Sequence, residues 1–247
     1  SRVTCFPVNI SGATSASYTT PVTTTADTGS TYRVMVTNTA GSITSNSATL
    51  TVNPSSTVPM AHYKLDETSG LTASDAAGTN PGTLVNNPIW MPIGGKIGGA
   101  LSFNGVNQYV TSSLSSLGTL TNGTLAFWVN RARAGTYEIL AEGPFSSPSF
   151  EGTNPLEFYV NNDCATNITV NADGWHHLAG TWDGTNAKTY LDGVLQNTTP
   201  CTSAPILGTF TLGGRSGSYS FQGSLDDVRL YNRALSASEV SALYNPV

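Results

Sequence analysis

Two pairs of side chains are of the types that perform acid–base or metal chemistry. His176 and His177 are adjacent in a strand-like run, where neighbouring side chains point to opposite faces, so both cannot ligate one ion. Glu138 and Glu142 are four residues apart, which in a strand places them on one face at about 13 Å. Glycosidic cleavage needs two carboxyl groups at roughly 5–9.5 Å. We therefore expect packing roles for the histidines, with metal or acid–base function as the alternative, and no catalytic acid pair.

Loop aromatics are the other candidates, because a ring face stacks on the apolar face of a sugar while nearby polar groups bind its hydroxyls. Trp90 lies in an Asn- and Pro-rich stretch, and two further irregular stretches span 137–150 and 213–221. The predicted ligand-binding residues of these stretches are Trp90, Phe145, Phe150, Arg215 and Tyr219. Packing beneath the loops is the alternative for each. The other three tryptophans lie in strand-like blocks and are predicted to be core residues: Trp128, Trp175 and Trp182.

Charge and composition exclude several classes of function. Only 10% of the residues are charged, and the net charge is −5. Nucleic-acid binding requires a basic stripe that neutralises phosphates, whereas the ten Lys and Arg are scattered singly. An anionic membrane surface is disfavoured for the same reason, and no apolar run approaches the ~20 residues that span a bilayer. Few charges, abundant Ser and Thr and three widely spaced Cys suit an extracellular protein, either a mature product or an excised piece.

The first part of the chain, residues 1–53, is almost uncharged and rich in Thr. Alternating runs predict strands, and these are 16–20, 32–37 and 47–52, with a turn at 38–41. Two prolines then bracket small polar residues, so that 54–59 is predicted to be a short, semi-extended linker.

The second part, residues 60–247, predicts a larger β domain. Short β-rich runs alternate with Gly, Asn and Asp turns, and two Asp-Gly pairs are strong hairpin signals. Many short strands without helical periodicity favour a sandwich or jelly roll. The run from Ser236 to Glu239 fits a capping box, so one short helix is expected near the C-terminus.

Several runs of this second part resemble a known family. The opening 63–70, the block 175–184 and the closing run 221–236 are similar to the laminin-G-like jelly-roll domains of the concanavalin A-like superfamily. The resemblance implies an all-β, antiparallel jelly-roll sandwich with one short C-terminal helix. It is permissive about function, because this fold hosts binding modules, adhesion domains and enzymes. Relatives that hydrolyse polysaccharides place acids on one strand as Glu-x-Asp, and the sequence has no such pair.

Asp226 is the acid that is predicted to be buried in the core. Alternation places it on the face of Val228 and Leu230, where an isolated buried charge is costly. Asp227 then faces the other way, with Arg229 as its expected ion-pair partner. Relatives with this fold often carry a structural calcium between their first and last strands, and calcium takes oxygen ligands. The predicted calcium ligands, with salt bridges or turn caps as the alternative, are Asp66, Asp75, Asn80 and Asp226.

Residues 1–53 resemble the tail of a bacterial immunoglobulin-like module, through the runs 10–18, 26–32 and 36–52. Val34 stands where that family often has a disulfide Cys. A complete module takes about 100 residues and seven strands, so this one is predicted to be partial. Either its missing strands were lost when the chain was cut, or a neighbouring subunit supplies them by strand addition.

The three cysteines differ in their surroundings. Cys164 and Cys201 lie in polar loops that flank the hairpin 175–195, and we predict a disulfide between them, with two free thiols as the alternative. Cys5 has no assigned partner.

Three functions are compatible with these observations. The first is a non-catalytic, lectin-like module that binds a polysaccharide or glycoconjugate, stabilised by calcium, behind an immunoglobulin-like spacer. The second is a structural or adhesive subunit that binds neighbouring subunits through its N-terminal module. The third is a glycan-cleaving enzyme with an unrecognised site.

Overall fold

The computed structural model describes residues 9–20, 23, 27–50, 58–132, 138–143, 149–150, 155–160, 164–172, 174–202, 207–214 and 219–245. The chain divides into two compact units, Ser1–Ser56 and Thr57–Val247. The boundary falls within the predicted linker 54–59. No helix among the described residues is long and apolar enough to cross a membrane.

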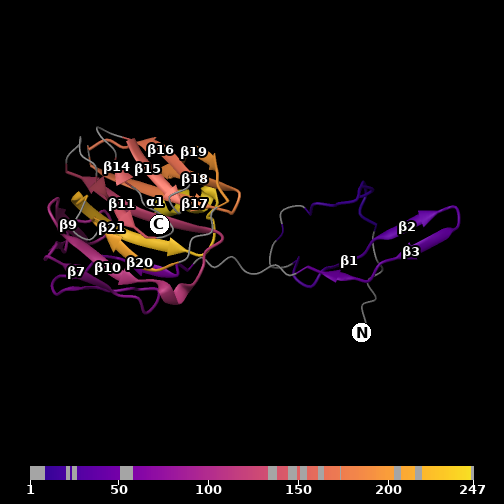
Figure 1. Cartoon of the computed structure of the whole chain (residues 1–247), viewed down its shortest axis with the longest axis horizontal. Helices are drawn as coiled ribbons and strands as arrows, with labels where there is room; N and C mark the ends of the chain where they lie inside the picture. Colours follow the sequence, from indigo (N-terminus) through magenta and orange to yellow (C-terminus); the bar gives the residue numbers. More distant parts are fainter. Residues whose placement is uncertain are drawn as a thin grey trace. The chain divides into compact units, whose positions relative to one another are not determined.

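One layer of the larger unit is an eight-stranded antiparallel sheet (Figure 1). Its strands are, in spatial order, β19 (Val194–Pro200), β18 (Asn186–Leu191), β17 (Trp175–Trp182), β11 (Gly123–Arg131), β21 (Gln222–Tyr231), β9 (Ala100–Asn104) and β8 (Ile89–Met91), and β5 (Ala61–Tyr63) also pairs with β21. The Asp192-Gly193 turn joins β18 to β19, as the hairpin signal predicts.

Two smaller sheets form the opposing layer. The five-stranded sheet has the order β13 (Ala141–Glu142), β20 (Thr209–Leu212), β10 (Tyr109–Ser113), β7 (Gly82–Val85) and β6 (Thr72–Ala73). The four-stranded sheet has the order β12 (Glu138–Ile139), β14 (Ser149–Phe150), β15 (Pro155–Val160) and β16 (Cys164–Thr169). A 3-10 helix, Ser115–Leu117, follows β10.

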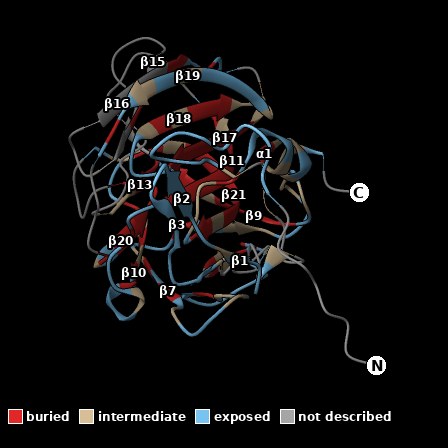
Figure 2. Cartoon of the chain, turned by 90° about the vertical axis from the view of Figure 1, so that its right-hand side faces the viewer, coloured by how far each residue is buried: buried red, intermediate tan, exposed pale blue. Residues whose placement is uncertain are grey.

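The main core lies between these two layers, because strand alternation buries one face of each sheet. The eight-stranded sheet contributes Phe127 and Trp182, the five-stranded sheet Phe210, and the four-stranded sheet Phe158. Figure 2 shows β18 and β21 as buried strands, whereas β19 at the sheet edge is mostly exposed. The predicted all-β, antiparallel sandwich is thus confirmed.

A short helix, α1 (Ala237–Tyr244), begins at the predicted capping box. The Ser236 side chain accepts from the backbone N–H of Glu239, and the Glu239 carboxylate accepts from the backbone N–H of Ser236. Arg233 donates two further hydrogen bonds to Glu239, at 2.7 and 2.9 Å, and lowers the pKa of that carboxyl to about 2. Glu239 thus ties the first turn of α1 to Arg233, two residues after the end of β21.

The smaller unit contains two short ribbons. Strand β1 (Thr31–Tyr32) pairs with β4 (Ala48–Thr49), and β2 (Met35–Asn38) pairs with β3 (Gly41–Thr44) around the predicted turn. The described part of 16–20 contains no strand, so that prediction is wrong. Every residue of β2 and β3 is exposed (Figure 2). An immunoglobulin-like identity for this unit stays a prediction.

Candidate functional site

The middle of the outer face of the eight-stranded sheet, over β17, β11 and β21, is covered. Helix α1 packs Val240 on a second buried cluster that includes Ala126 and Tyr231. Trp128 is only 1% exposed, and its ring lies 5.5 Å from the Tyr244 ring of α1. Lys96, from the loop 94–99, places Nζ 4.9 Å from the Trp128 ring centroid. We call this outer surface the covered face, and it offers a ligand little access.

His176 and His177 have separate roles, because adjacent residues of a strand point to opposite faces of the sheet. His177 lies on the covered face with its ring edge-on to Trp128 at 5.2 Å, and burial lowers its pKa to about 4. His176 pairs its Nδ1 with Asp192 Oδ2 at 2.9 Å, and Asp192 Oδ1 accepts from the backbone N–H of His177. Both histidines therefore contribute to packing and to the β18–β19 turn.

A β-bulge changes the predicted orientation of the acids in β21. The register of β21 against β11 shifts between Ala126 and Trp128, and Asp227 adopts a left-handed φ of 50°. Asp226 consequently lies opposite Trp128 on the covered face, so its predicted place beside Val228 in the core is wrong.

Asp227 and Arg229 form the expected ion pair, at 2.9 Å. His62 of β5 adds a second contact to Asp227, with Nε2 2.6 Å from Oδ1. Burial alone would raise the pKa of Asp227, but His62 and Arg229 overcome it and hold that pKa below its usual range. The network ties the first strand of the domain to the last.

The predicted calcium ligands fall into two groups. Asp66 and Asp226 both contact the loop 94–99, accepting from the backbone N–H groups of Gly99 (2.7 Å) and Ile97 (2.8 Å). Asp75 instead accepts from the backbone of His62 and Asn80, at 2.8 and 3.2 Å. Within the described ranges, no group of three or more His, Cys, Asp or Glu is placed to hold a metal ion. The four residues thus do not converge on one point.

Asp226 is unusual among these acids because it is completely buried. Its Oδ1 has no hydrogen-bond partner, and burial raises its pKa to about 7 although backbone N–H groups of Ile97 and Lys96 favour the charged form. Gly95 is required here, since a Cβ on it would lie 1.8 Å from the carbonyl oxygen of Gly99. An orphaned carboxylate oxygen beside Asp66 is compatible with a cation, and calcium binding stays a prediction.

The outer face of the five-stranded sheet carries a different set of side chains. Strand register aligns one residue from each strand in a row that crosses the sheet: Thr72, Thr83, Thr111, Thr211 and Glu142. Their neighbours along the strands, such as Leu84, Val110 and Phe210, point into the core. Since adjacent strands are about 4.8 Å apart, the row is roughly 19 Å long. We call these five residues the threonine row.

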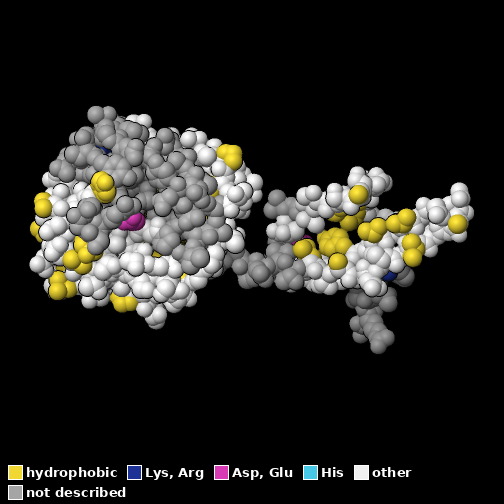
Figure 3. All heavy atoms as spheres, in the orientation of Figure 1, with side chains coloured by type: hydrophobic (Ala, Val, Ile, Leu, Met, Phe, Trp, Pro, Cys, Tyr) yellow, Lys and Arg dark blue, Asp and Glu magenta, His cyan; other side chains and the backbone are white. Residues whose placement is uncertain are grey.

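The threonine row is open at one end. Thr72 and Thr83 are exposed and Thr111 is half-buried, and the hydroxyls of all three lack a hydrogen-bond partner in the described part of the chain. Half-buried Tyr109, next along β10, places a ring beside the row. Figure 3 shows few charged side chains on the side of this unit that it draws. The open end therefore offers hydroxyls without a partner among the described residues, and an aromatic ring beside them.

The other end of the threonine row is closed. Thr211 is only 6% exposed, and its hydroxyl donates to the backbone carbonyl of Gly214 at 2.7 Å. The chain reaches that position because Gly213 takes a φ of 82°, where a Cβ would meet the Phe103 ring at 2.3 Å. Glu142 is half-buried at this end and already has a partner within the chain.

The structure describes the side chains of only two of the five predicted ligand-binding residues, Trp90 and Tyr219. Trp90 lies in strand β8 rather than in a loop, packs against the core, and donates from Nε1 to the carbonyl of Gly70 at 2.9 Å. Tyr219 is 50% exposed, with a left-handed φ of 54°. Phe145 and Arg215 lie outside the described residues, as does the side chain of Phe150 in β14.

The strand arrangement also shows where the acid pair and the other tryptophans lie. Glu138 and Glu142 lie on β12 and β13, which belong to different sheets, so the expected shared face does not form. Trp128 and Trp182 are buried as predicted, and Trp175 is half-buried.

The cysteines are incompletely described. Cys201 is 3% exposed and disulfide-bonded. Cys164 opens β16, which packs beside β19, but its side chain is not described, so the Cys164–Cys201 pairing stays a prediction. Cys5 lies outside the described residues.

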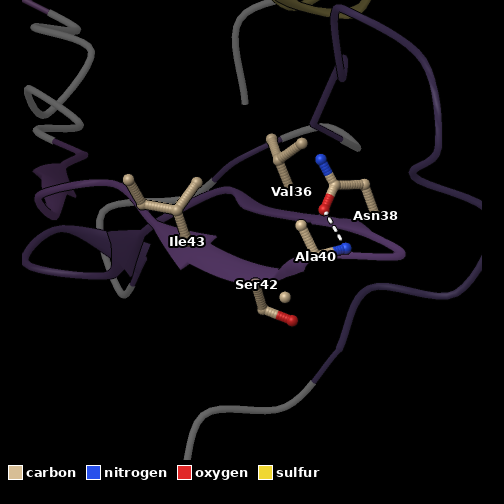
Figure 4. A pocket seen from close by; sticks show the side chains of 6 residues that line it. Val36, Asn38, Ala40, Ser42 and Ile43 are labelled. Carbon is tan, nitrogen blue, oxygen red and sulfur yellow. Dashed lines mark hydrogen bonds between the residues drawn. The ribbon is translucent and has the colours of Figure 1, made fainter.

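The smaller unit has a hollow of about 290 Å³ along its β2–β3 ribbon (Figure 4). Val36, Ile43 and the backbone of Gly41 line it, and the Asn38 side chain closes the turn by accepting from Ala40 at 2.8 Å. The ribbon also exposes Met35 at 60%. Its apolar side chains therefore lack the packing of a complete sandwich.

Sequence reasoning missed the threonine row. In Thr209–Leu212 outward Thr alternates with inward Phe210 and Leu212, so the outward polar positions of that strand are detectable in the sequence. The sequence holds no signal for the order β6, β7, β10, β20 and β13, and it is this order that aligns residues from 72 to 211.

Comparison with known proteins places this geometry in a family. The Concanavalin A-like lectin/glucanases superfamily, through its laminin G-type model, matches residues 103–241. No curated protein matches the sequence. Domain 4 of AbnA, an extracellular GH43 arabinanase from Geobacillus stearothermophilus solved with arabinotriose, is similar at a TM-score of 0.62 and 23% identity, covering 75% of this chain and 98% of that domain.

Two further solved structures share the fold at lower coverage of their own length. The binding domain of botulinum neurotoxin serotype G is similar at a TM-score of 0.56 and 18% identity, covering 69% of this chain and 47% of that one. A Trypanosoma rangeli sialidase in complex with sialic acid gives a TM-score of 0.58 and 18% identity, with 74% and 32% covered. The family match spans more than half of the sequence, and the chain therefore belongs to the concanavalin A-like lectin/glucanases superfamily.

Proposed function

We propose that the Thr57–Val247 unit is a non-catalytic carbohydrate-binding module whose ligand lies on the threonine row. The observation that carries the proposal is the alignment of three hydroxyls, from Thr72, Thr83 and Thr111, that have no partner within the described chain. Hydroxyls that both donate and accept suit sugar hydroxyls, and the Tyr109 ring offers an apolar surface beside them.

Known structures with this fold support a sugar as the ligand. The arabinanase domain was solved with arabinotriose and the sialidase with sialic acid. At these identities the likeness extends to the fold alone, so the sugar and its position are argued from the threonine row.

The acids described on the row support a binding role rather than hydrolysis. Hydrolysis of a glycosidic bond needs two carboxyl groups on either side of the scissile bond. Among the described positions of the threonine row, Glu142 is the one carboxylate. A glycan-cleaving enzyme is the weaker alternative, and release of reducing ends from a bound glycan would favour it.

A glycan array is the first test of this proposal. We expect at least one glycan to bind, and the Thr83→Val and Thr111→Val variants to bind it about three- to tenfold more weakly each, the cost of one neutral hydrogen bond. Thr198→Val, at an exposed position on β19, is the matched control. Loss of binding in the control, or unchanged binding in both row variants, would contradict the assignment of the row.

The smaller unit favours a second function. Its β2–β3 ribbon exposes Val36 and Ile43, at 60% and 73%, and has open backbone edges that accept a further strand. Pairing with a neighbouring subunit would make the chain an adhesive or structural component. Light scattering tests this: a monomer at all concentrations would contradict it.

An extracellular setting completes the proposal. A Cys164–Cys201 bridge would close the loop over residues 165–200 and stabilise the fold by roughly 3–4 kcal/mol. Peptide mapping checks the pairing, and alkylation of both thiols without prior reduction would exclude it.

Structural calcium is proposed for the same setting, with Asp66 and Asp226 as the two acids that contact the loop 94–99. A cation bound only by the native state stabilises it by mass action. We expect a chelator to lower the melting temperature of metal-loaded protein, and an unchanged melting curve would exclude the ion.

A further inference from the structure

We infer that the threonine row binds the end of a neutral glycan chain, two or three sugar units deep, with the chain entering over β6. This inference rests on the proposed function and adds the charge of the ligand and the part of the chain that is bound.

The direction follows from the burial along the row. Thr72 and Thr83 are exposed, Thr111 is half-buried and Thr211 is 6% exposed. A ligand that lies on the hydroxyls of β6, β7 and β10 therefore meets a row that becomes inaccessible at β20. Because β6 is the edge strand of the five-stranded sheet and Thr72 on it is exposed, a longer chain would leave the row over β6.

The closed end is made by backbone and is therefore firm. The Thr211 hydroxyl is already used by the Gly214 carbonyl at 2.7 Å, and the Gly213 N–H donates to the Leu140 carbonyl at 2.8 Å. Gly213 also contacts the Phe103 ring too closely for any other residue. Because several contacts fix this turn, we expect it to stay in place when a ligand binds, so that the accessible part of the row ends at Thr111.

The accessible length limits how many sugar units bind. The three free hydroxyls span two strand spacings, roughly 10 Å. A sugar unit is about as long as one strand spacing, so two or three units contact the hydroxyls of Thr72, Thr83 and Thr111. Units beyond the third would lie past β6 and add little affinity.

The charge of the site selects a neutral ligand. The described outward positions of β6, β7, β10 and β20 hold hydroxyls, Val85 and Tyr109, and they include no cation. A sugar carboxylate is bound most strongly by Arg or Lys, which form charge-assisted hydrogen bonds with it. The closed end holds the carboxylate Glu142, which has a partner within the chain, and the net charge of the chain is −5. Anionic sugars are thus disfavoured.

The test uses a defined series of probes with the full chain. Titration calorimetry is performed with linear arabino-, xylo- and cello-oligosaccharides of one to six units, and with oligogalacturonides as the anionic series. For the neutral series that binds, we expect the affinity to rise about tenfold or more from one unit to three, since added units add hydrogen bonds. Beyond three units it should change less than about twofold, and oligogalacturonides should bind at least about tenfold more weakly.

Chain-end binding is tested separately with the matching polymer. The number of binding sites per gram is measured before and after partial acid hydrolysis that doubles the number of chain ends. End recognition predicts a doubling of sites, whereas recognition of internal units predicts no change.

Variants tie the result to the row. Thr72→Val should weaken trimer binding but leave the monomer nearly unaffected, because Thr72 contacts the outermost unit, while Thr198→Val on β19 should change neither. Affinity that keeps rising beyond three units, sites independent of the number of ends, or equal binding of oligogalacturonides would overturn the inference and leave the proposed function intact. Failure of every probe and of the glycan array would overturn the proposed function itself.

Discussion

The two outer faces of the sandwich use the same strand alternation for opposite purposes. On the covered face, Trp128 and His177 are buried beneath α1 and the loop 94–99. On the five-stranded sheet, Thr72 and Thr83 remain exposed with hydroxyls that bind nothing in the described chain. The covered face has large rings and contributes stability, whereas the threonine row has small polar groups and leaves its bonding capacity for a ligand. Mutations on the two faces should therefore separate stability from binding.

The largest effect is expected from Trp128→Ala on the covered face. Removing a buried ring that contacts Tyr244 and His177 should lower the free energy of unfolding by roughly 3–5 kcal/mol. Urea denaturation measures the loss. Trp128→Phe retains part of the ring and should fold where the alanine variant does not. Glycan binding by either folded variant should match that of wild type. A specific loss of binding would show that the covered face takes part in ligand binding.

The second effect depends on pH and comes from His177. Its pKa of about 4 in the folded protein lies below that of an exposed imidazole, near 6.5, so the unfolded chain binds the extra proton between these values. This contribution to stability is present above pH 6.5 and is lost as the pH falls toward 4. Between pH 7.0 and 4.5, wild type should lose about 2–3 kcal/mol more than His177→Gln. Equal losses in the two proteins would show that folding does not lower the pKa of His177.

A smaller effect is expected at the start of α1. The hydroxyl of Ser236 accepts from the backbone N–H of Glu239 at 3.4 Å, which is long for a cap. Ser236→Ala should therefore lower stability by about 0.5–1 kcal/mol, the low end for loss of an N-cap. Thermal melts at neutral pH measure this. A loss above about 2 kcal/mol would contradict this expectation. It would mean that the cap contributes more to keeping α1 on the covered face than the packing of Val240 and Tyr244 does.

Local signals predicted the parts of the fold that depend on neighbouring residues. The capping box at Ser236, the turn at 38–41 and the Asp192-Gly193 hairpin are each specified within a few residues, and the structure contains all three. Alternation failed at Asp226 because one extra residue at a bulge exchanges the two faces, and no local pattern marks that insertion.

The site was less predictable because it depends on which strands become neighbours. The Asn- and Pro-rich surroundings of Trp90 predict a loop, but pairing with β9 makes it part of strand β8. Thr72 and Thr211 lie 139 positions apart in the sequence and meet in one row only through the order of the sheet. Composition indicated exposed hydroxyls, while their alignment is a property of the tertiary fold.

The central claim is that the ligand binds on the threonine row and not on the covered face. Its most direct test is an NMR titration of the isotope-labelled chain with arabinotriose, or with the tightest neutral glycan from the array. We predict that the largest chemical-shift changes occur at Thr83, Thr111 and Tyr109, with little change at Trp128 and His177. Changes concentrated on α1 and the loop 94–99, with those of β7 and β10 unmoved, would contradict the account.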